Sequence, residues 1–169
     1  MSWNVVNPAT ETVFCTIEPT SDSELESILS RMRRAQQQWR EAPVEQRAHV
    51  CRQFIDTFRS MKESVALDIT RQMGKPLGQA RREVDTMLDR AEAMVRLATA
   101  APQDDLLGPK EDFRRFIRRE PLGIVLDIPA WNCPLPIAVN LVAPGLLAGN
   151  AVLIKHARLL PLCGDALVL

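Results

Sequence analysis

The chain has 169 residues, 46% hydrophobic and 25% charged, and its 21 basic side chains balance 21 acidic ones. This length suits one modest domain or two small pieces of a larger one. A net charge of zero provides no field to attract nucleic acid or an anionic membrane surface, so we expect neither as a partner. Neither a secretion signal nor an apolar run of roughly 18 residues is present, which favours a cytoplasmic protein.

The cysteines do not suggest a metal site. There is no C-x-x-C pair, and only His49 and His156 could join the cysteines as ligands, so we expect no bound metal. We interpret all four as free thiols in a reducing compartment: Cys15, Cys51, Cys133 and Cys163.

The chain is predicted to open with two short strands and a helix. "NPAT" (7–10) is typical of a turn, and the β-prone "TVFCTI" (12–17) should pair with the extended start. Ser21 and Glu24 fit a capping box, and apolar residues then recur at helical spacing as far as Trp39.

Three further helices are predicted before residue 100. The second has Pro43 in its first turn and continues to Met61, and the third covers residues 63–73. Gly74 should end the third helix, and the fourth has its buried stripe over residues 80–98.

The pattern changes beyond residue 101. "PQDDLLGPK" (102–110) is typical of a connection, and "FRRFIRR" (113–119) of an exposed strand. The apolar run "LGIVLDI" (122–128) suits a strand covered on both faces, and "AVLIK" (151–155) a second buried strand.

Helices are expected after each of these two strands. "PLPIAVNLVAPGLLAGN" (134–150) predicts one that bends at Pro144 and closes at Gly149, and "LLPLCGDALVL" (159–169) predicts another. The alternation of strand and helix predicts a right-handed parallel crossover unit.

Polar and aromatic residues follow both strands of this unit. Ligands of open parallel sheets bind beyond the carboxyl ends of the strands, where Trp131, Asn132 and Lys155 are expected. The amide of Asn132 could donate to an oxygen that becomes negative, Lys155 could bind hydroxyls or a phosphate, and Trp131 offers an apolar wall. The alternative is that Asn132 only caps the helix that starts at Pro134.

The segment "EPLGIVLDIPAWNCPLPIAVNLVAPGLLAGNAVLIKHA" resembles the aldehyde dehydrogenase superfamily, whose usual pattern is E-P-x-G, P-W-N-F-P and A-G-N-x-V-x-x-K-P-S. "NPAT" and "GKPLGQARREVD" are similar to its opening and its G-K-P helix junction. The resemblance implies an α/β fold: a mainly helical region (1–112), a strand and connection (113–121), and the first βαβα part of a truncated, Rossmann-like parallel sheet that binds the dinucleotide (122–169).

The resemblance also implies roles for individual residues. Asn132 is similar to the oxyanion-hole amide of the family, and Lys155 to the lysine that holds the adenosine ribose of NAD or NADP. The expected walls of the cofactor groove are Ile128, Pro129, Ala130 and Trp131. The family binds its cofactor without a G-x-G-x-x-G loop, so the absence of that loop is no objection.

Two positions depart from the family pattern. Where K-P-S-E is usual, the chain has "KHAR", so Arg158 replaces a glutamate and would favour NADP by pairing with its 2′-phosphate. Alternatively, Arg158 points to solvent. Ala157 lacks a hydroxyl that the family often has, which weakens the expected phosphate contact.

Cys133 stands where the family usually has an aromatic residue of the substrate channel. The family nucleophile comes from a much later segment, so we expect Cys133 to line the channel; a nucleophilic role is the remote alternative.

The reaction implied is oxidation of an aldehyde to a carboxylic acid through a thiohemiacetal on a cysteine that this chain lacks. Family members are longer, and "DALVL" has no stop signal, which is typical of a truncated piece. Without nucleophile and glutamate base, the chain alone is expected to be inactive, whereas the full-length protein would be a homo-oligomer. The alternative is a short natural product that acts as a non-catalytic interaction or regulatory module on a full-length relative.

Overall fold

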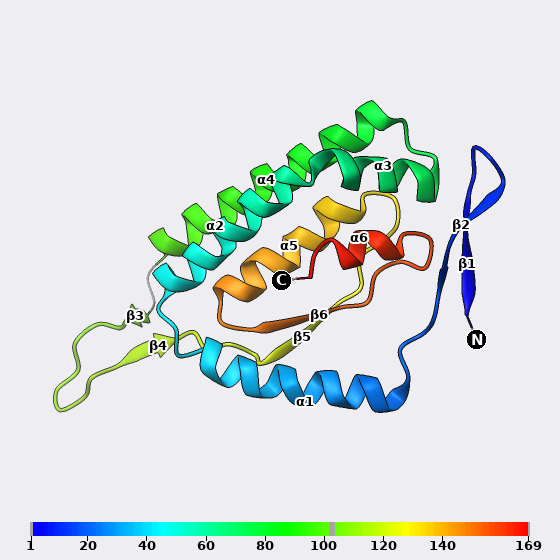
Figure 1. Cartoon of the computed structure of the whole chain (residues 1–169). Coiled ribbons are helices and arrows are strands. Elements are labelled where there is room, and N and C mark those ends of the chain that lie inside the picture. The colour runs from blue at the N-terminus through cyan, green and yellow to red at the C-terminus, as the bar shows by residue number, and fades with distance from the viewer. Residues whose placement is uncertain (1, 102–103, 169) are drawn as a thin grey trace.

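An antiparallel hairpin opens the chain, as predicted, in the computed structural model that describes residues 2–101 and 104–168 (Figure 1). β1 (Trp3–Asn7) pairs with β2 (Thr12–Ile17). The Asn7 side chain accepts a hydrogen bond from Ala9 N at 2.9 Å. Asparagine forms turns by bonding the backbone two residues on, which is why "NPAT" predicts one.

The next two helices, α1 (Asp22–Trp39) and α2 (Val44–Ser60), begin differently. Ser21 Oγ accepts from Glu24 N at 3.3 Å, and Glu24 Oε2 accepts from Ser21 N at 2.8 Å, so the predicted capping box is confirmed. Pro43 lies one residue before α2 instead of in its first turn. Its missing N–H has no bond to make at that position either.

A glycine separates α3 (Lys62–Met73) from α4 (Leu77–Ala100), as predicted. Gly74 has φ 76° and donates its N–H to Thr70 O at 2.8 Å. At 24 residues α4 is long, yet neither it nor any other helix in the described ranges is apolar enough over sufficient length to cross a membrane.

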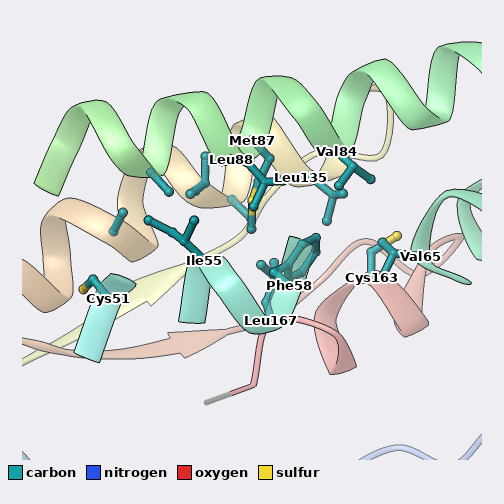
Figure 2. Close-up of a cluster of buried hydrophobic side chains, with 14 of the residues drawn as sticks. Cys51, Ile55, Phe58, Val65, Val84, Met87, Leu88, Leu135, Cys163 and Leu167 are labelled. Carbon is teal, nitrogen blue, oxygen red and sulfur yellow. The ribbon is translucent and has the colours of Figure 1, made fainter. Parts of the chain in front are cut away.

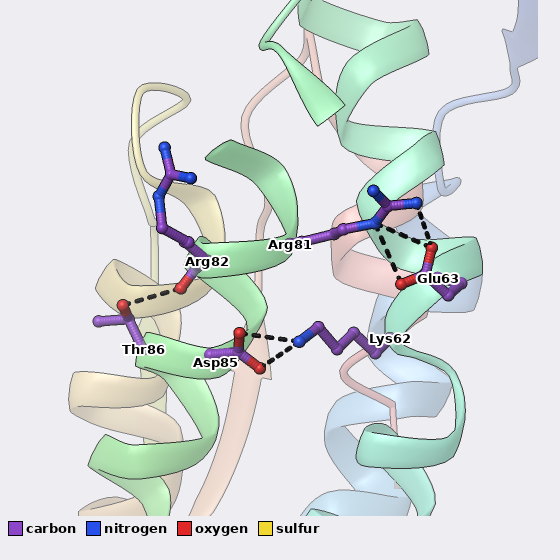
Figure 3. Close-up of polar contacts among 6 residues, drawn as sticks. All are labelled: Lys62, Glu63, Arg81, Arg82, Asp85 and Thr86. Atoms are coloured by element: carbon purple, nitrogen blue, oxygen red, sulfur yellow. Dashed lines mark hydrogen bonds and ion pairs between the residues drawn. The ribbon is translucent and has the colours of Figure 1, made fainter. Parts of the chain in front are cut away.

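Ion pairs connect α3 to α4 at the surface (Figure 3). Lys62 Nζ lies 2.6 Å from Asp85 Oδ1, and Arg81 Nη2 lies 2.8 Å from Glu63 Oε2. Exposed pairs of this kind contribute roughly 0–1 kcal/mol each, so we attribute the packing of these helices mainly to their apolar faces.

The short strands β3 (Asp104–Leu106) and β4 (Phe116–Arg118) form an antiparallel hairpin that extends from the helices (Figure 1). The exposed strand is confirmed, but interpreting residues 102–110 as a plain connection is wrong for β3. Asp and Gly have a low strand propensity, so the sequence does not predict a strand there. In the structure Arg118 pairs with Asp104 across the hairpin at 3.2 Å, which stabilises the strand despite that low propensity. Residues 102 and 103 lie outside the described ranges.

The predicted parallel unit is confirmed. β5 (Ile124–Asp127) pairs in parallel with β6 (Ala151–Ile154), and α5 (Pro134–Leu147) connects them. The prediction that β5 is covered on both faces is wrong, because Leu126 is 53% exposed. α5 packs on one face of the pair, whereas α1 runs along the other face and leaves Leu126 open (Figure 1). The final helix, α6 (Pro161–Asp165), is short.

Buried side chains of α2, α3, α4, α5 and α6 pack into a shared hydrophobic core (Figure 2). Its buried side chains include Ile55, Phe58, Met87, Leu135 and Cys163. These residues come from both sides of the divisions expected at residues 112 and 121, and those divisions remain a prediction.

Two side chains of α1 bond the end of α5. Gln36 Nε2 donates to Gly149 O at 3.1 Å, and Trp39 Nε1 donates to Leu146 O at 2.8 Å. Leu146 O also accepts from Gly149 N at 3.0 Å, so Trp39 adds a second donor to it, whereas Gln36 provides a donor for the carbonyl of the residue that closes the helix. Gly149 has φ 87° and closes α5, as predicted.

Candidate functional site

The carboxyl ends of β5 and β6 lie side by side. Asp127 pairs with Ile154 in the strand register, and Lys155 N continues the ladder by donating to Asp127 O at 2.8 Å. The segments 128–133 and 155–158 therefore leave the sheet from adjacent positions. This juxtaposition is the geometry that a crevice between two strand ends needs.

Most of the first segment faces solvent. Ile128 is 62% exposed and Trp131 53% exposed, and Ala130 is exposed as well, whereas Pro129 is buried. Large apolar side chains left open at a strand end are available to pack against a ligand or another part of a protein. Their expected place in a cofactor groove remains a prediction.

Asn132 does not cap α5. The N-cap residue is Cys133, whose side chain makes no capping hydrogen bond, and Leu135 N instead donates to Glu83 Oε1 at 3.2 Å. A carboxylate from α4 supplies the acceptor that the Asn132 amide would have provided, so the capping alternative is wrong. Within the described ranges the exposed Asn132 side chain makes no hydrogen bond, which leaves its amide free to donate.

Cys133 is exposed and free, and it follows Asn132 directly. Its position beside the proposed amide suits a side chain that borders the reacting group. Its substrate-channel role is untested and remains a prediction.

The second segment carries unpaired positive charge. Lys155 is exposed and forms no ion pair with the described residues. Arg158 is also exposed, and its guanidinium lies over the Trp3 ring, with Cζ 5.5 Å from the ring centroid. Trp3 Nε1 donates to Arg158 O at 3.2 Å, so the first strand of the chain holds this residue by both its backbone and its side chain. Ala157, which precedes Arg158 in this segment, is partly buried.

A buried carboxyl and a partly buried imidazole adjoin the strand ends and were not predicted. Asp127 closes β5, and burial raises the pKa of its carboxyl. His156 follows Lys155, and burial lowers the pKa of its imidazole to about 4. The neutral forms of both side chains are therefore more strongly favoured here than they are in water.

Sequence reasoning also missed Lys75 and Glu83, which contact the Asn132 segment. Lys75 Nζ donates to Asn132 O at 2.9 Å and pairs with Glu83. The available signal was the place of Glu83 on the apolar stripe of α4, three residues after Ala80 and four before Met87. A carboxylate on a buried helix face needs a specific partner.

Comparison with known proteins identifies the family of this chain. The model of the aldehyde dehydrogenase family matches residues 1–169. A 3,6-anhydro-alpha-L-galactose dehydrogenase of Vibrio sp. strain EJY3 is 32% identical over 158 residues, or 94% of this chain and 33% of that protein. The chain belongs to the aldehyde dehydrogenase family.

Solved structures agree in fold. A 3,6-anhydro-L-galactose dehydrogenase in complex with NAP has a TM-score of 0.89 and 30% identity, with 97% of this chain and 34% of that chain covered. An aldehyde dehydrogenase from Brucella melitensis biovar abortus 2308 has a TM-score of 0.91 and 28% identity, with 98% and 34% covered. The chain thus spans about a third of the length of these relatives.

Proposed function

We propose that this chain is the N-terminal portion of an oxidoreductase that converts an aldehyde to a carboxylic acid with NAD or NADP. The observation that carries the proposal is the exposed segment 128–133 at the end of β5, beside Lys155 at the end of β6. The relatives named above are dehydrogenases, and one of them was solved with NAP bound.

The donors at the two strand ends fit a dinucleotide. Lys155 and Arg158 provide positive charge without an acidic partner among the described residues, which suits ribose hydroxyls and phosphate oxygens. Trp131 and Ile128 would cover apolar parts of the ligand. When bound, the dinucleotide supplies the hydride acceptor.

Asn132 would act on the aldehyde itself. Its amide donates to the carbonyl oxygen as that oxygen gains negative charge, and a donor already in place needs no reorganisation during the reaction. Cys133 would line the path of the aldehyde. The attacking thiolate and the base belong, in this proposal, to residues outside the 169 of this chain.

Arg158 sets an expectation for the choice of cofactor. Its guanidinium, held over Trp3, would pair with a 2′-phosphate, so NADP should bind at least as well as NAD. Arg158→Glu should shift the ratio of the two dissociation constants towards NAD by roughly 10-fold, because a charge-assisted bond is lost and a repulsion gained. Titration of the purified chain, with Lys62→Met as a matched surface control, measures this shift; a wild-type preference for NAD would contradict it.

The activity itself is tested with a panel of aldehydes. The purified chain should reduce neither NAD nor NADP, whereas a longer protein from the same reading frame should reduce one of them and lose most of its kcat on Asn132→Ala. Turnover by the chain alone that disappears in Cys133→Ala would make Cys133 the nucleophile and overturn the assignment.

A non-catalytic interaction module is the second candidate. It is favoured by exposed apolar side chains on the β3–β4 hairpin and just before β5, including Leu106, Phe113, Ile117 and Leu122. Such a module should bind a full-length family member in a pull-down with purified proteins, and the absence of any complex would argue against it.

A further inference from the structure

A buried ion pair holds the segment that carries Asn132. Lys75 lies in the connection between α3 and α4, Glu83 lies on α4, and their side chains are only 12% and 6% exposed. Lys75 Nζ donates to Asn132 O at 2.9 Å, and Glu83 Oε1 accepts from Leu135 N at 3.2 Å. The pair therefore bonds the backbone on both sides of Cys133.

Among the described residues, no other side chain hydrogen-bonds the backbone of residues 132–135. The first N–H groups of a helix lack partners within it, and Cys133 supplies no capping bond to α5. Glu83 bonds one of these groups, and Lys75 fixes the carbonyl of the residue just before the cap. With both ends held, rotation of the intervening peptides is suppressed, and the Asn132 side chain starts from a fixed Cα.

The backbone on both sides of Lys75 is itself restricted. Gly74 ends α3 in a left-handed conformation with φ 76°, and Pro76 precedes the first residue of α4. A charge pair buried at this junction is costly to remove from water, and a lone charge left there costs more. The surface pairs of Figure 3 already join α3 to α4. The bonds of the Lys75–Glu83 pair to the backbone of Asn132 and Leu135 therefore indicate a second structural role for this pair.

We propose that Lys75 and Glu83 are positioning residues that hold the Asn132 amide in place for the reaction. This inference rests on the proposed function of Asn132. Neither residue touches the aldehyde in this account. They act through the backbone of residues 132–135, and preorganised donors of this kind lose their effect when displaced by about 1 Å.

The position of Asn132 is measured directly by NMR of the ¹⁵N-labelled chain. In Lys75→Met the side-chain amide of Asn132 and the backbone amides of Cys133 and Leu135 should shift and broaden, while resonances of α1 and α2 stay in place. Lys75→Arg keeps the charge and a donor, so it should restore them. Lys62→Met, which breaks the surface pair with Asp85, is the matched control and should leave them unchanged.

Glu83→Gln covers the case in which Lys75→Met does not fold. Glutamine preserves the shape of the side chain and an acceptor for Leu135 N, but it removes the charge that orients Lys75. Asn132 resonances with wild-type positions and line widths in this variant, or in a folded Lys75→Met, would overturn the positioning role.

Kinetics of the aldehyde-oxidising protein that contains this segment distinguish the role of Asn132 in the reaction from the positioning role of Lys75 and Glu83. Asn132→Ala should lower kcat roughly 100-fold, and Lys75→Met should lower it roughly 10-fold or more with little change in KM. The double variant should lose no more than Asn132→Ala alone. An unchanged kcat in Asn132→Ala would defeat the proposed function, whereas a loss in Asn132→Ala without one in Lys75→Met would defeat only the positioning role.

Discussion

The folded protein favours the neutral form of the His156 imidazole. Burial lowers its imidazole pKa to about 4, below the value near 6.5 that the unfolded chain has. As the pH falls below 6.5, the unfolded state takes up a proton before the folded state does. The stability that His156 contributes is therefore present above pH 6.5 and is lost as the pH falls towards 4.

Replacement of His156 by glutamine should remove this pH dependence. The free energy of unfolding of the wild type, minus that of His156→Gln, should decrease steadily from pH 7 to pH 4 in urea titrations. His49→Gln, at an exposed position on α2, is the control for the loss of a histidine that is not buried. A difference that stays constant over this range would contradict the burial argument.

Three of the four thiols should react in two classes. Burial raises the pKa of Cys51 to about 11 and that of Cys163 to about 12, whereas Cys133 is exposed. Because the thiolate is the reactive form, a disulfide reagent at pH 8 should modify Cys133 first and the two buried cysteines only on unfolding. Mass spectrometry of the native protein measures the order, and a fast-reacting Cys163 in Cys133→Ser would refute it.

Which site residues a sequence reveals depends on how each one acts. That Asn132 and Lys155 leave the sheet from adjacent strand ends could be predicted, because each comes shortly after an apolar strand and the carboxyl ends of parallel strands meet; their roles remain a prediction. The contact of Lys75 could not be predicted, because its partner atom is a backbone carbonyl 57 residues away, and a carbonyl leaves no trace in the sequence. Asn132 also looked like a cap, since sequence alone could not show Glu83 reaching Leu135 from another helix.

At the scale of elements, the α3–α4 junction depends on a glycine. Gly74 has φ 76°, and a Cβ built on it would lie 3.0 Å from Pro8 Cγ in the first turn of the chain. Side chains other than glycine rarely adopt this conformation, and adopting it costs about 1–2 kcal/mol. The junction and the N-terminal turn therefore restrict the same position.

Two alanine substitutions should have opposite effects. Gly74→Ala should lower the free energy of unfolding by about 1–2 kcal/mol. Gly78→Ala, in the first turn of α4 and 3.9 Å from its nearest neighbour, Arg82 Nη1, should raise it by up to about 1 kcal/mol. Urea titrations of both variants measure the effects. Equal losses in the two variants would show that lost space, and not backbone conformation, decides the outcome.

Elements with strong local patterns were predictable, and elements that depend on distant partners were not. The helices up to Ala100 follow from apolar periodicity and from local residues such as Ser21 and Gly74. β3 was missed because Asp104 and Asp105 resemble loop residues until β4 pairs with them. Leu126 looked buried because apolar runs usually are, but the face of its strand that carries it is left open.

At the scale of the whole molecule, the small sheets should make the chain associate. Leu106 is 74% exposed and Ile117 is 53% exposed, and the hairpin that carries them pairs with no further strand among the described residues. Apolar area of this kind favours contact with another protein surface.

Light scattering after size-exclusion chromatography should show a mass that rises with protein concentration. Leu106→Glu combined with Ile117→Glu should weaken this association by at least roughly 10-fold, since each apolar side chain contributes about 1.5–3 kcal/mol when fully buried. Leu67→Glu on α3 is the control for added charge. A monomer at every concentration would contradict the prediction.

The bonds from α1 to the end of α5 also constrain the order of folding. Gln36 and Trp39 bond carbonyls of residues 149 and 146, which emerge from the ribosome more than 100 residues later. While α2, α3 and α4 are being synthesised, the α5 carbonyls that α1 bonds do not yet exist. The apolar face of α1 therefore stays exposed to solvent or bound to a chaperone during that time. Since Trp39 makes one of these bonds, its fluorescence would report the moment at which α1 docks on α5.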